Sequence, residues 1–269
     1  QVAGRILVPK YGTKLVMTLA FPIVTFSALL TVISSSYFYF LLTFISCGIV
    51  WGAYGPIGGI HSQLIERHFK KIITPYYAMG FNLGILLGGG LAGLIMRNNY
   101  EPYISFTILS FLSILVSYFV YSFGLPRDLD FKGEGEKFKF PETNVLLFGF
   151  LLFFVFGSGG IIMDWSTLWL SKDLNTPLYL ASMGLIFFSI GGIFANLFSN
   201  SLINLFTEKV VGCHFVMIGA AIMFLSLLTN NFYIILGVLC IYGFAIANLV
   251  PIIIRQAVKQ SNESIPMTV

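Results

Sequence analysis

The sequence predicts an all-α, polytopic membrane protein. Hydrophobic residues make up 57% of its 269 residues and charged residues only 10%, and long apolar stretches recur along the chain. An ordinary soluble domain carries about 25% charged residues. Helices that are apolar on every side need lipid rather than water around them, so the bilayer is the solvent that this composition fits.

The first half of the chain contains four stretches long enough to cross a bilayer. A hydrocarbon core of about 30 Å takes about 20 helical residues. Apolar stretches of that length occur near 15–34, 37–65, 74–96 and 103–123. Charged, Pro or Asn residues bound each of them, as is typical of short loops between membrane helices.

The second half repeats this pattern after a polar segment, PRDLDFKGEGEKFKFPET, whose mixed charges and glycines are typical of a solvated linker. Four more apolar stretches follow near 145–170, 178–205, 211–229 and 232–257. An equal split about a linker is typical of transporters built from two repeated halves. We therefore predict an N-terminal bundle at 1–123, a linker at 124–144 and a C-terminal bundle at 145–269.

The charged loops predict how the chain lies in the membrane, because Lys and Arg accumulate on the cytoplasmic side. One set of alternate loops holds only Arg97 and Lys172. The other set holds the remaining Lys and Arg residues: Arg5, Lys10, Lys14, Arg67, Lys70, Lys71, Arg127, Lys132, Lys137, Lys139, Lys209, Arg255 and Lys259. The middle linker and both chain ends belong to this second set and are predicted to be cytoplasmic.

Several function classes find no support in the residue patterns. Cys47, Cys213 and Cys240 each lie in an apolar run without metal-type spacing, so we expect neither a disulfide nor a metal site. No Gly-rich phosphate loop or nucleophile elbow occurs, so we expect no enzyme and no cofactor. The net charge of +4 is spread over short loops, so no nucleic-acid partner is expected. The chain starts inside a basic loop without a signal peptide, and we expect it to be a fragment.

Asp164 is the one carboxylate inside an apolar stretch, in SGGIIMDWSTLWL. A charge at the centre of a span costs at least about 2.5 kcal/mol, so Asp164 is expected to face a wet cavity or a polar partner. Alternatively, it lies at the outer interface, where Trp165 and Trp169 would act as anchors. The first interpretation makes Asp164 and Trp165 candidate solute-binding residues.

Tyr54 and His61 are seven residues apart and share one helical face, among the glycines and proline of WGAYGPIGGIHSQ. A Gly/Pro interruption lets a membrane helix expose its backbone to a cavity. We therefore expect Tyr54 and His61 to line a substrate cavity. The alternative is that His61 only hydrogen-bonds to a neighbouring helix.

Small and amide residues also lie inside the spans. Amides in lipid usually bond across helices for about 0.6 kcal/mol each, which explains Asn196 and Asn200. Asn82 and Asn248 are candidate binding residues, and Asn248 precedes Pro251, which frees a backbone carbonyl for a cavity. The small-residue spacing in the third span predicts close helix packing there, at Gly84, Gly88, Gly89 and Gly93.

Four stretches resemble one family, the fucose-permease-like branch of the Major Facilitator Superfamily and its uncharacterised bacterial inner-membrane members. GRILVPKYGTK looks like the conformational loop after helix two, with the matching residues Gly4, Lys10, Gly12 and Lys14. IERHFKK with YYAMGFNLGILLGG is similar to the end of helix four and to helix five. MDWSTLWL resembles part of helix seven, and GFAIANLVPIIIRQA resembles helix ten.

This resemblance implies a major facilitator fold of two bundles, of which the chain holds helices three to ten of twelve, in an inner-membrane monomer. It implies secondary active transport by alternating access, with symport of a proton or another cation. We expect the solute to be a small polar organic molecule, sugar-like or drug-like. The alternative is a polytopic sensor or scaffold that has lost transport, and a membrane enzyme is the third possibility.

Overall fold

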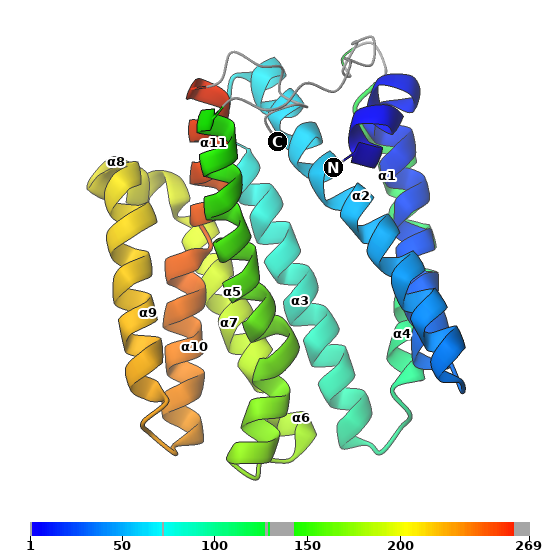
Figure 1. The fold of residues 1–269 in the computed structure, drawn as a ribbon, viewed down its shortest axis with the longest axis vertical. Coiled ribbons are helices and arrows are strands. Elements are labelled where there is room, and N and C mark those ends of the chain that lie inside the picture. Colours follow the sequence, from blue (N-terminus) through cyan, green and yellow to red (C-terminus); the bar gives the residue numbers. More distant parts are fainter. Residues whose placement is uncertain (1, 72, 127–128, 130–142, 261–269) are drawn as a thin grey trace. The chain divides into compact units, whose positions relative to one another are not determined.

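The computed structural model describes the chain except residues 1, 72, 127–128, 130–142 and 261–269. The side chains of 2–9, 53–56, 144–145 and 258–260 also lie outside the description. The described part folds into α-helices and one π-helical turn (Figure 1). Among the described residues, eight helical segments are long and apolar enough to cross a membrane, which confirms the predicted fold class.

The helices follow the predicted spans closely. Their bounds are α1 Val2–Val32, α2 Tyr37–Phe69, α3 Thr74–Arg97, α4 Tyr103–Phe123, α5 Thr143–Asp173, α6 Leu178–Ala181, α7 Met183–Leu197, α8 Ser199–Lys209, the π-helix η1 Val210–His214, α9 Phe215–Ser226, α10 Phe232–Ile246 and α11 Leu249–Gln260. One boundary was wrong. The predicted sixth span, 178–205, ends at Leu197, because the backbone turns at Phe198 and a more polar helix, α8, follows.

The described helices form two compact units. The first contains α1, α2 and α4, and the second contains α3 and α5 to α11. This grouping places α3 with the later helices, whereas the predicted N-terminal bundle, 1–123, includes it. The predicted bundles rest on the repeat pattern of transporters rather than on compactness, so that division stays a prediction.

In the first unit, α1 packs against both α2 and α4. Met17, Ala20 and Ile57 form its buried apolar cluster. Hydroxyl groups join α1 to α4: Thr25 Oγ1 and Ser113 Oγ lie 2.8 Å apart, and Ser110 Oγ donates to the Thr25 carbonyl at 3.1 Å. Hydrogen bonds between side chains of neighbouring helices, together with van der Waals packing and lipid entropy, drive helix association in lipid.

In the second unit, α7 packs along α10 and along α3. The apolar core between these helices and α5 includes Phe188, Leu239 and Tyr242. At the crossing of α7 and α10 the backbones touch. A Cβ added at Gly191 would lie 1.9 Å from the Cys240 carbonyl oxygen, and one at Gly243 would lie 2.0 Å from the Phe188 carbonyl oxygen. Only glycine allows this approach.

The last span is interrupted between α10 and α11. Pro251 has no N–H to donate to the carbonyl of Ala247, and its ring crowds that carbonyl, so the helix cannot continue unchanged. The chain makes a turn at Ala247 and Asn248 before α11 begins. The break therefore falls inside an apolar span, at Asn248.

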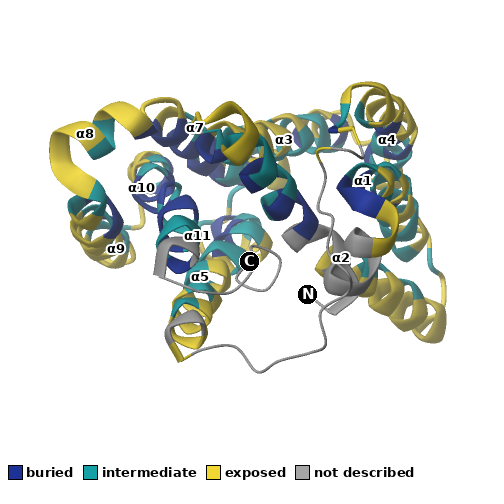
Figure 2. Ribbon diagram, turned by 90° about the horizontal axis from the view of Figure 1, so that it is seen from above, coloured by how far each residue is buried: buried dark blue, intermediate teal, exposed yellow. Residues whose placement is uncertain are grey.

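Large apolar side chains are exposed along most of the spans. Phe111, Phe153 and Met217 have 64%, 70% and 71% of their surface exposed. Figure 2 shows buried residues concentrated on α7, α10 and α11, whereas α9 is mainly exposed. Helix faces that expose so many apolar side chains are suited to contact with lipid, in agreement with the prediction of a membrane protein.

Candidate functional site

A cluster of three buried amides surrounds one turn of α7. Asn248, at the break after α10, donates from Nδ2 to the carbonyl of Ala195 at 3.0 Å. Asn82, on α3, lies directly against Gly192, where an added Cβ would be 2.7 Å from its Oδ1. Gly192 and Ala195 are three residues apart, which is less than one helical turn. The structure thus places two of the predicted binding residues against the same turn of α7, and Asn196, which belongs to that turn, is the third member.

Most of the hydrogen-bonding capacity of this α7 amide cluster is unused among the described residues. Asn196 is 1% exposed, and neither its Nδ2 nor its Oδ1 has a partner. Asn248 is equally buried, and its Oδ1 has no partner. Asn82 uses Nδ2 on the Ala78 carbonyl of its own helix, at 3.1 Å. A buried polar atom without a partner costs about 1–3 kcal/mol, so these atoms favour a polar guest or water.

His61 forms a hydrogen bond between helices of the first unit. Its Nδ1 lies 2.9 Å from Thr13 Oγ1 on α1. Thr13 is fully buried and His61 is half-buried. This contact matches the alternative given for His61, a bond to a neighbouring helix, and its predicted place in a cavity stays a prediction. Tyr54 belongs to α2, but its side chain lies outside the described residues.

Asp164 and its neighbour Trp165 are exposed on α5, and Trp165 has 61% of its surface exposed. The structure does not bring Asp164 to the α7 amide cluster through any described hydrogen bond. Ser166, one residue further along, is buried. Whether Asp164 faces water or a polar partner stays a prediction.

The predicted conformational loop forms the beginning of α1. Gly12 interrupts the helix with φ 81° and ψ 158°, a conformation that L-residues rarely adopt. The Lys10 ammonium lies 5.2 Å from the ring centre of Tyr11, and the Lys14 ammonium lies 5.3 Å from that of Tyr121 on α4. Gly4 lies in α1, in the segment whose side chains are not described.

Sequence reasoning missed a charged cluster in the second unit. Glu208, in α8, forms an ion pair with Arg255 of α11, with 3.7 Å between Glu208 Oε1 and Arg255 Nη2. Its other carboxylate oxygen accepts a hydrogen bond from Nε2 of Gln256. Both charged residues stand at predicted loop edges, and no residue pattern indicates that α8 folds back toward α11.

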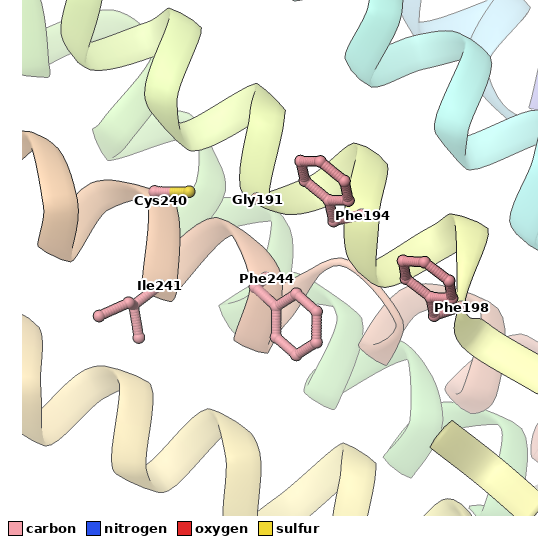
Figure 3. Close-up of a pocket in the computed structure, with 6 residues that line it drawn as sticks. All are labelled: Gly191, Phe194, Phe198, Cys240, Ile241 and Phe244. Atoms are coloured by element: carbon pink, nitrogen blue, oxygen red, sulfur yellow. The ribbon is translucent and has the colours of Figure 1, made fainter. Parts of the chain in front are cut away.

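One groove in the second unit has a volume of about 400 Å³ and is lined by Gly191, Phe194, Phe198, Cys240, Ile241 and Phe244. Figure 3 shows aromatic and aliphatic side chains from α7, from Phe198 at the turn after it, and from α10. None of the predicted binding residues whose side chains are described lines it. Its surface offers carbon and one thiol, so it suits an apolar chain rather than a polar solute.

Comparison with known proteins identifies the family. Residues 1–264 match the family model of the Major Facilitator Superfamily. The chain is also 22% identical over 262 residues to an uncharacterised MFS-type transporter of Yersinia pestis, a match that covers 95% of this chain and 66% of that protein. The chain spans about two thirds of that relative's length. Because the family match covers nearly the whole sequence, the chain belongs to the Major Facilitator Superfamily.

Proposed function

We propose that this chain belongs to a secondary active transporter for a small polar organic solute, in the fucose-permease-like branch of its family. The solute is sugar-like or drug-like and crosses by alternating access, coupled to a proton or another cation. The observation that carries this proposal is the α7 amide cluster. Its unpartnered buried atoms are groups that a hydroxyl-bearing solute can satisfy.

The cluster suits recognition of hydroxyl groups because an amide both donates and accepts. Asn196 offers two donor hydrogens and one acceptor oxygen, and Asn248 offers its remaining oxygen. Hydrogen bonds that form only when the solute is present contribute about 0.5–1.5 kcal/mol each. Three such atoms would therefore give affinity without any charge on the solute.

The remaining predicted residues have supporting roles in this proposal. Tyr54 and His61 would bind the solute through their polar groups, and Trp165 would stack on an apolar solute face. Asp164 would hold the coupling cation or proton, since a carboxylate in the middle of an apolar stretch is costly unless it has such a role. The protein would act as a monomer in the inner membrane, with the middle linker and both chain ends in the cytoplasm. No bond is made or broken, so it is not an enzyme.

Uptake by the full-length protein in proteoliposomes tests this function. Sugars, polyols and small cationic drugs are presented with and without a proton gradient, and with an ionophore that collapses it. We expect one solute class to accumulate only while the gradient lasts. Specific binding without flux, under every gradient, would instead support the sensor or scaffold alternative.

Amide variants test the proposed binding cluster. We expect Asn196→Ala and Asn248→Ala to weaken solute affinity about fivefold to tenfold, because each removes about one net hydrogen bond. Asn98→Ala is the matched control, since its amide caps its own helix at the exposed end of α3. Unchanged affinity in both cluster variants, at normal folded yield, would exclude the cluster as the binding site.

Asp164→Asn tests ion coupling. We expect it to abolish gradient-driven accumulation while leaving solute exchange across the membrane intact, because exchange needs no net ion movement. Asp173→Asn, an exposed carboxylate at the end of the same helix, is the control. An equal loss of gradient-driven accumulation in both variants would show that Asp164 has no specific role in ion coupling.

Cysteine labelling tests the proposed orientation. Lys70→Cys, exposed just after α2, should react with a membrane-impermeant maleimide only from the cytoplasmic side. Glu101→Cys, exposed before α4, should react only from the outside. The reverse result would invert the orientation derived from Lys and Arg.

A further inference from the structure

The apolar groove between α7 and α10 has no part in the proposed transport function. Both helices belong to stretches long and apolar enough to cross a membrane, Leu178–Leu197 and Phe232–Ala257. The groove side chains Phe194, Phe198 and Ile241 are each about half exposed. The medium around a membrane span is lipid, so the exposed part of this groove meets acyl chains rather than water.

The groove exists because Gly191 has no side chain. Its backbone lies against the Cys240 carbonyl oxygen, and a Cβ there would lie only 1.9 Å from that atom. The aromatic rings of Phe194 and Phe198 follow three and seven residues later, and Phe244 faces them from α10 (Figure 3). Gly191 to Phe198 covers about 10 Å along the chain axis. The result is an elongated apolar slot, which suits a linear chain better than a compact solute.

A run of aromatic rings continues from this groove to α8. The ring of Phe244 lies 6.4 Å from that of Phe215 on α9, measured between ring centres. The ring of Phe215 in turn lies 5.5 Å from that of Phe206 on α8. Apolar surface therefore extends without interruption from the groove toward the end of the span, where α8 meets η1.

Basic side chains lie beside the end of this aromatic run. Lys209 ends α8, and His214 ends η1 directly before Phe215, and both are exposed. The π-helical turn between them is closed by the bond from the Phe215 N–H to the Val210 carbonyl, five residues back. Residues five apart lie about 140° apart around an α-helix, but the wider π turn brings them toward one side.

The acidic residue next to this basic pair is already neutralised. Glu208 forms an ion pair with Arg255 and accepts a hydrogen bond from Gln256. Lys209 therefore keeps a positive charge available at the surface. It also belongs to the loops that the Lys and Arg distribution predicts to be cytoplasmic, where basic residues attract anionic lipids.

We propose that the groove binds a phospholipid with an anionic headgroup. One acyl chain lies between α7 and α10, the lipid passes along Phe215 and Phe206, and its phosphate is held by the Lys209 ammonium and a ring N–H of His214. A protein segment would cover only the apolar slot, whereas the basic pair favours a ligand with both a chain and an anionic group. This lipid groove is separate from the α7 amide cluster, and its occupancy does not depend on the solute.

Photo-crosslinking in the full-length protein identifies the occupant. Phe194→p-benzoylphenylalanine is reconstituted in vesicles of equal parts phosphatidylcholine and phosphatidylglycerol, and mass spectrometry identifies the adducts. We expect phospholipid adducts in which phosphatidylglycerol exceeds phosphatidylcholine several fold. Phe224→p-benzoylphenylalanine, at an exposed site on α9, is the control and should yield the bulk ratio. A crosslink from Phe194 to another segment of the protein, or the bulk ratio at both sites, would overturn the proposal.

Variants of the basic pair test the headgroup contact. Lys209→Gln and His214→Asn should each lower the excess of phosphatidylglycerol at Phe194 toward the bulk ratio. Lys172→Gln, an exposed lysine near the end of α5, is the control and should leave the excess unchanged. An excess that survives the changes at both Lys209 and His214 would contradict the assigned headgroup site.

The melting temperature of the detergent-purified protein provides a readout that needs neither solute nor gradient. Added phosphatidylglycerol should raise it by several degrees more than phosphatidylcholine does, because a ligand that binds the folded state stabilises it. Lys209→Gln should remove this difference. Equal shifts for the two lipids in the unmodified protein would show that the groove does not select an anionic headgroup.

Discussion

The two units of this protein join their helices by different means. In the first, α1 and α4 meet through hydroxyl groups, at Thr25, Ser110 and Ser113. In the second, α7 and α10 meet backbone to backbone at Gly191 and Gly243. The hydrophobic effect, which packs helices together in water, does not act between helices in lipid. The first unit instead uses hydrogen bonds between helices, and the second uses close van der Waals contact.

The two kinds of contact differ in how much change they tolerate. A hydroxyl pair can lose one member and leave the other bonded to its own helix, as Ser113 is to the Ser110 carbonyl at 2.6 Å. A backbone crossing cannot adjust in this way, because the atom opposite Gly191 is the main-chain oxygen of Cys240, which cannot rotate away as a side chain can. Variants at the two contacts should therefore differ strongly in effect.

The largest effect is expected from Gly191→Ala. Its Cβ would overlap the Cys240 carbonyl oxygen, so α7 and α10 must separate, at a cost of about 3 kcal/mol or more. Folded yield in detergent and the melting temperature measure this. Gly237→Ala is the matched control on α10, since a Cβ there has no neighbour within 4 Å among the described residues. Equal melting temperatures for the two variants would show that the backbone contact at Gly191 does not stabilise the second unit in the way described.

An intermediate effect is expected at two residues where the backbone leaves the helical conformation, Gly12 in α1 and Thr207 in α8. Gly12→Ala should destabilise the protein by about 1–3 kcal/mol, because alanine is strained at φ 81°. Thr207→Gly should have the opposite sign and stabilise it by about 1 kcal/mol, since glycine adopts φ 70° without strain. Chemical denaturation of the purified variants measures both. Two changes of the same sign would contradict the shared turn conformation.

The smallest effect is expected from the hydroxyl contact. Ser113→Ala removes the bond to Thr25 and should cost about 0.6 kcal/mol, the average for hydrogen bonds between membrane helices. A double-mutant cycle with Thr25→Val isolates the pair, because each single change removes the same bond. A coupling energy as large as the Gly191→Ala effect would show that hydroxyls hold the first unit as rigidly as glycines hold the second.

The sequence predicted the spans well because hydropathy reports the solvent of a helix directly. It predicted the helix contacts poorly. The small-residue spacing in the third span pointed to close packing, but a Cβ added at Gly84 or Gly88 would have no neighbour within 4 Å among the described residues. One added at Gly93 would lie 2.8 Å from the Ser182 hydroxyl. A glycine permits close approach without specifying which helix approaches, so spacing alone cannot choose the crossing.

The candidate site shows the same limit. Asn82 and Asn248 were predicted as binding residues, and the structure places both against one turn of α7. Asn196 was interpreted as a bond between helices, but its amide has no partner among the described residues. The difference depends on what lies around the amide after folding, which hydropathy does not encode. The Thr207 turn was equally hidden, because a threonine carries no sequence signal for a left-handed conformation.

The crossing of α7 and α10 has a mechanical consequence. Where main chains touch, no layer of side chains lies between them that could slide or repack, and small sliding of packed helices is how shear motions occur. These two helices must therefore move together as one stiff pair in any conformational change of the second unit. Bending is left to the places where the backbone ladder is already open, and the break at Asn248 before Pro251 is such a joint, directly beside the unpartnered amides.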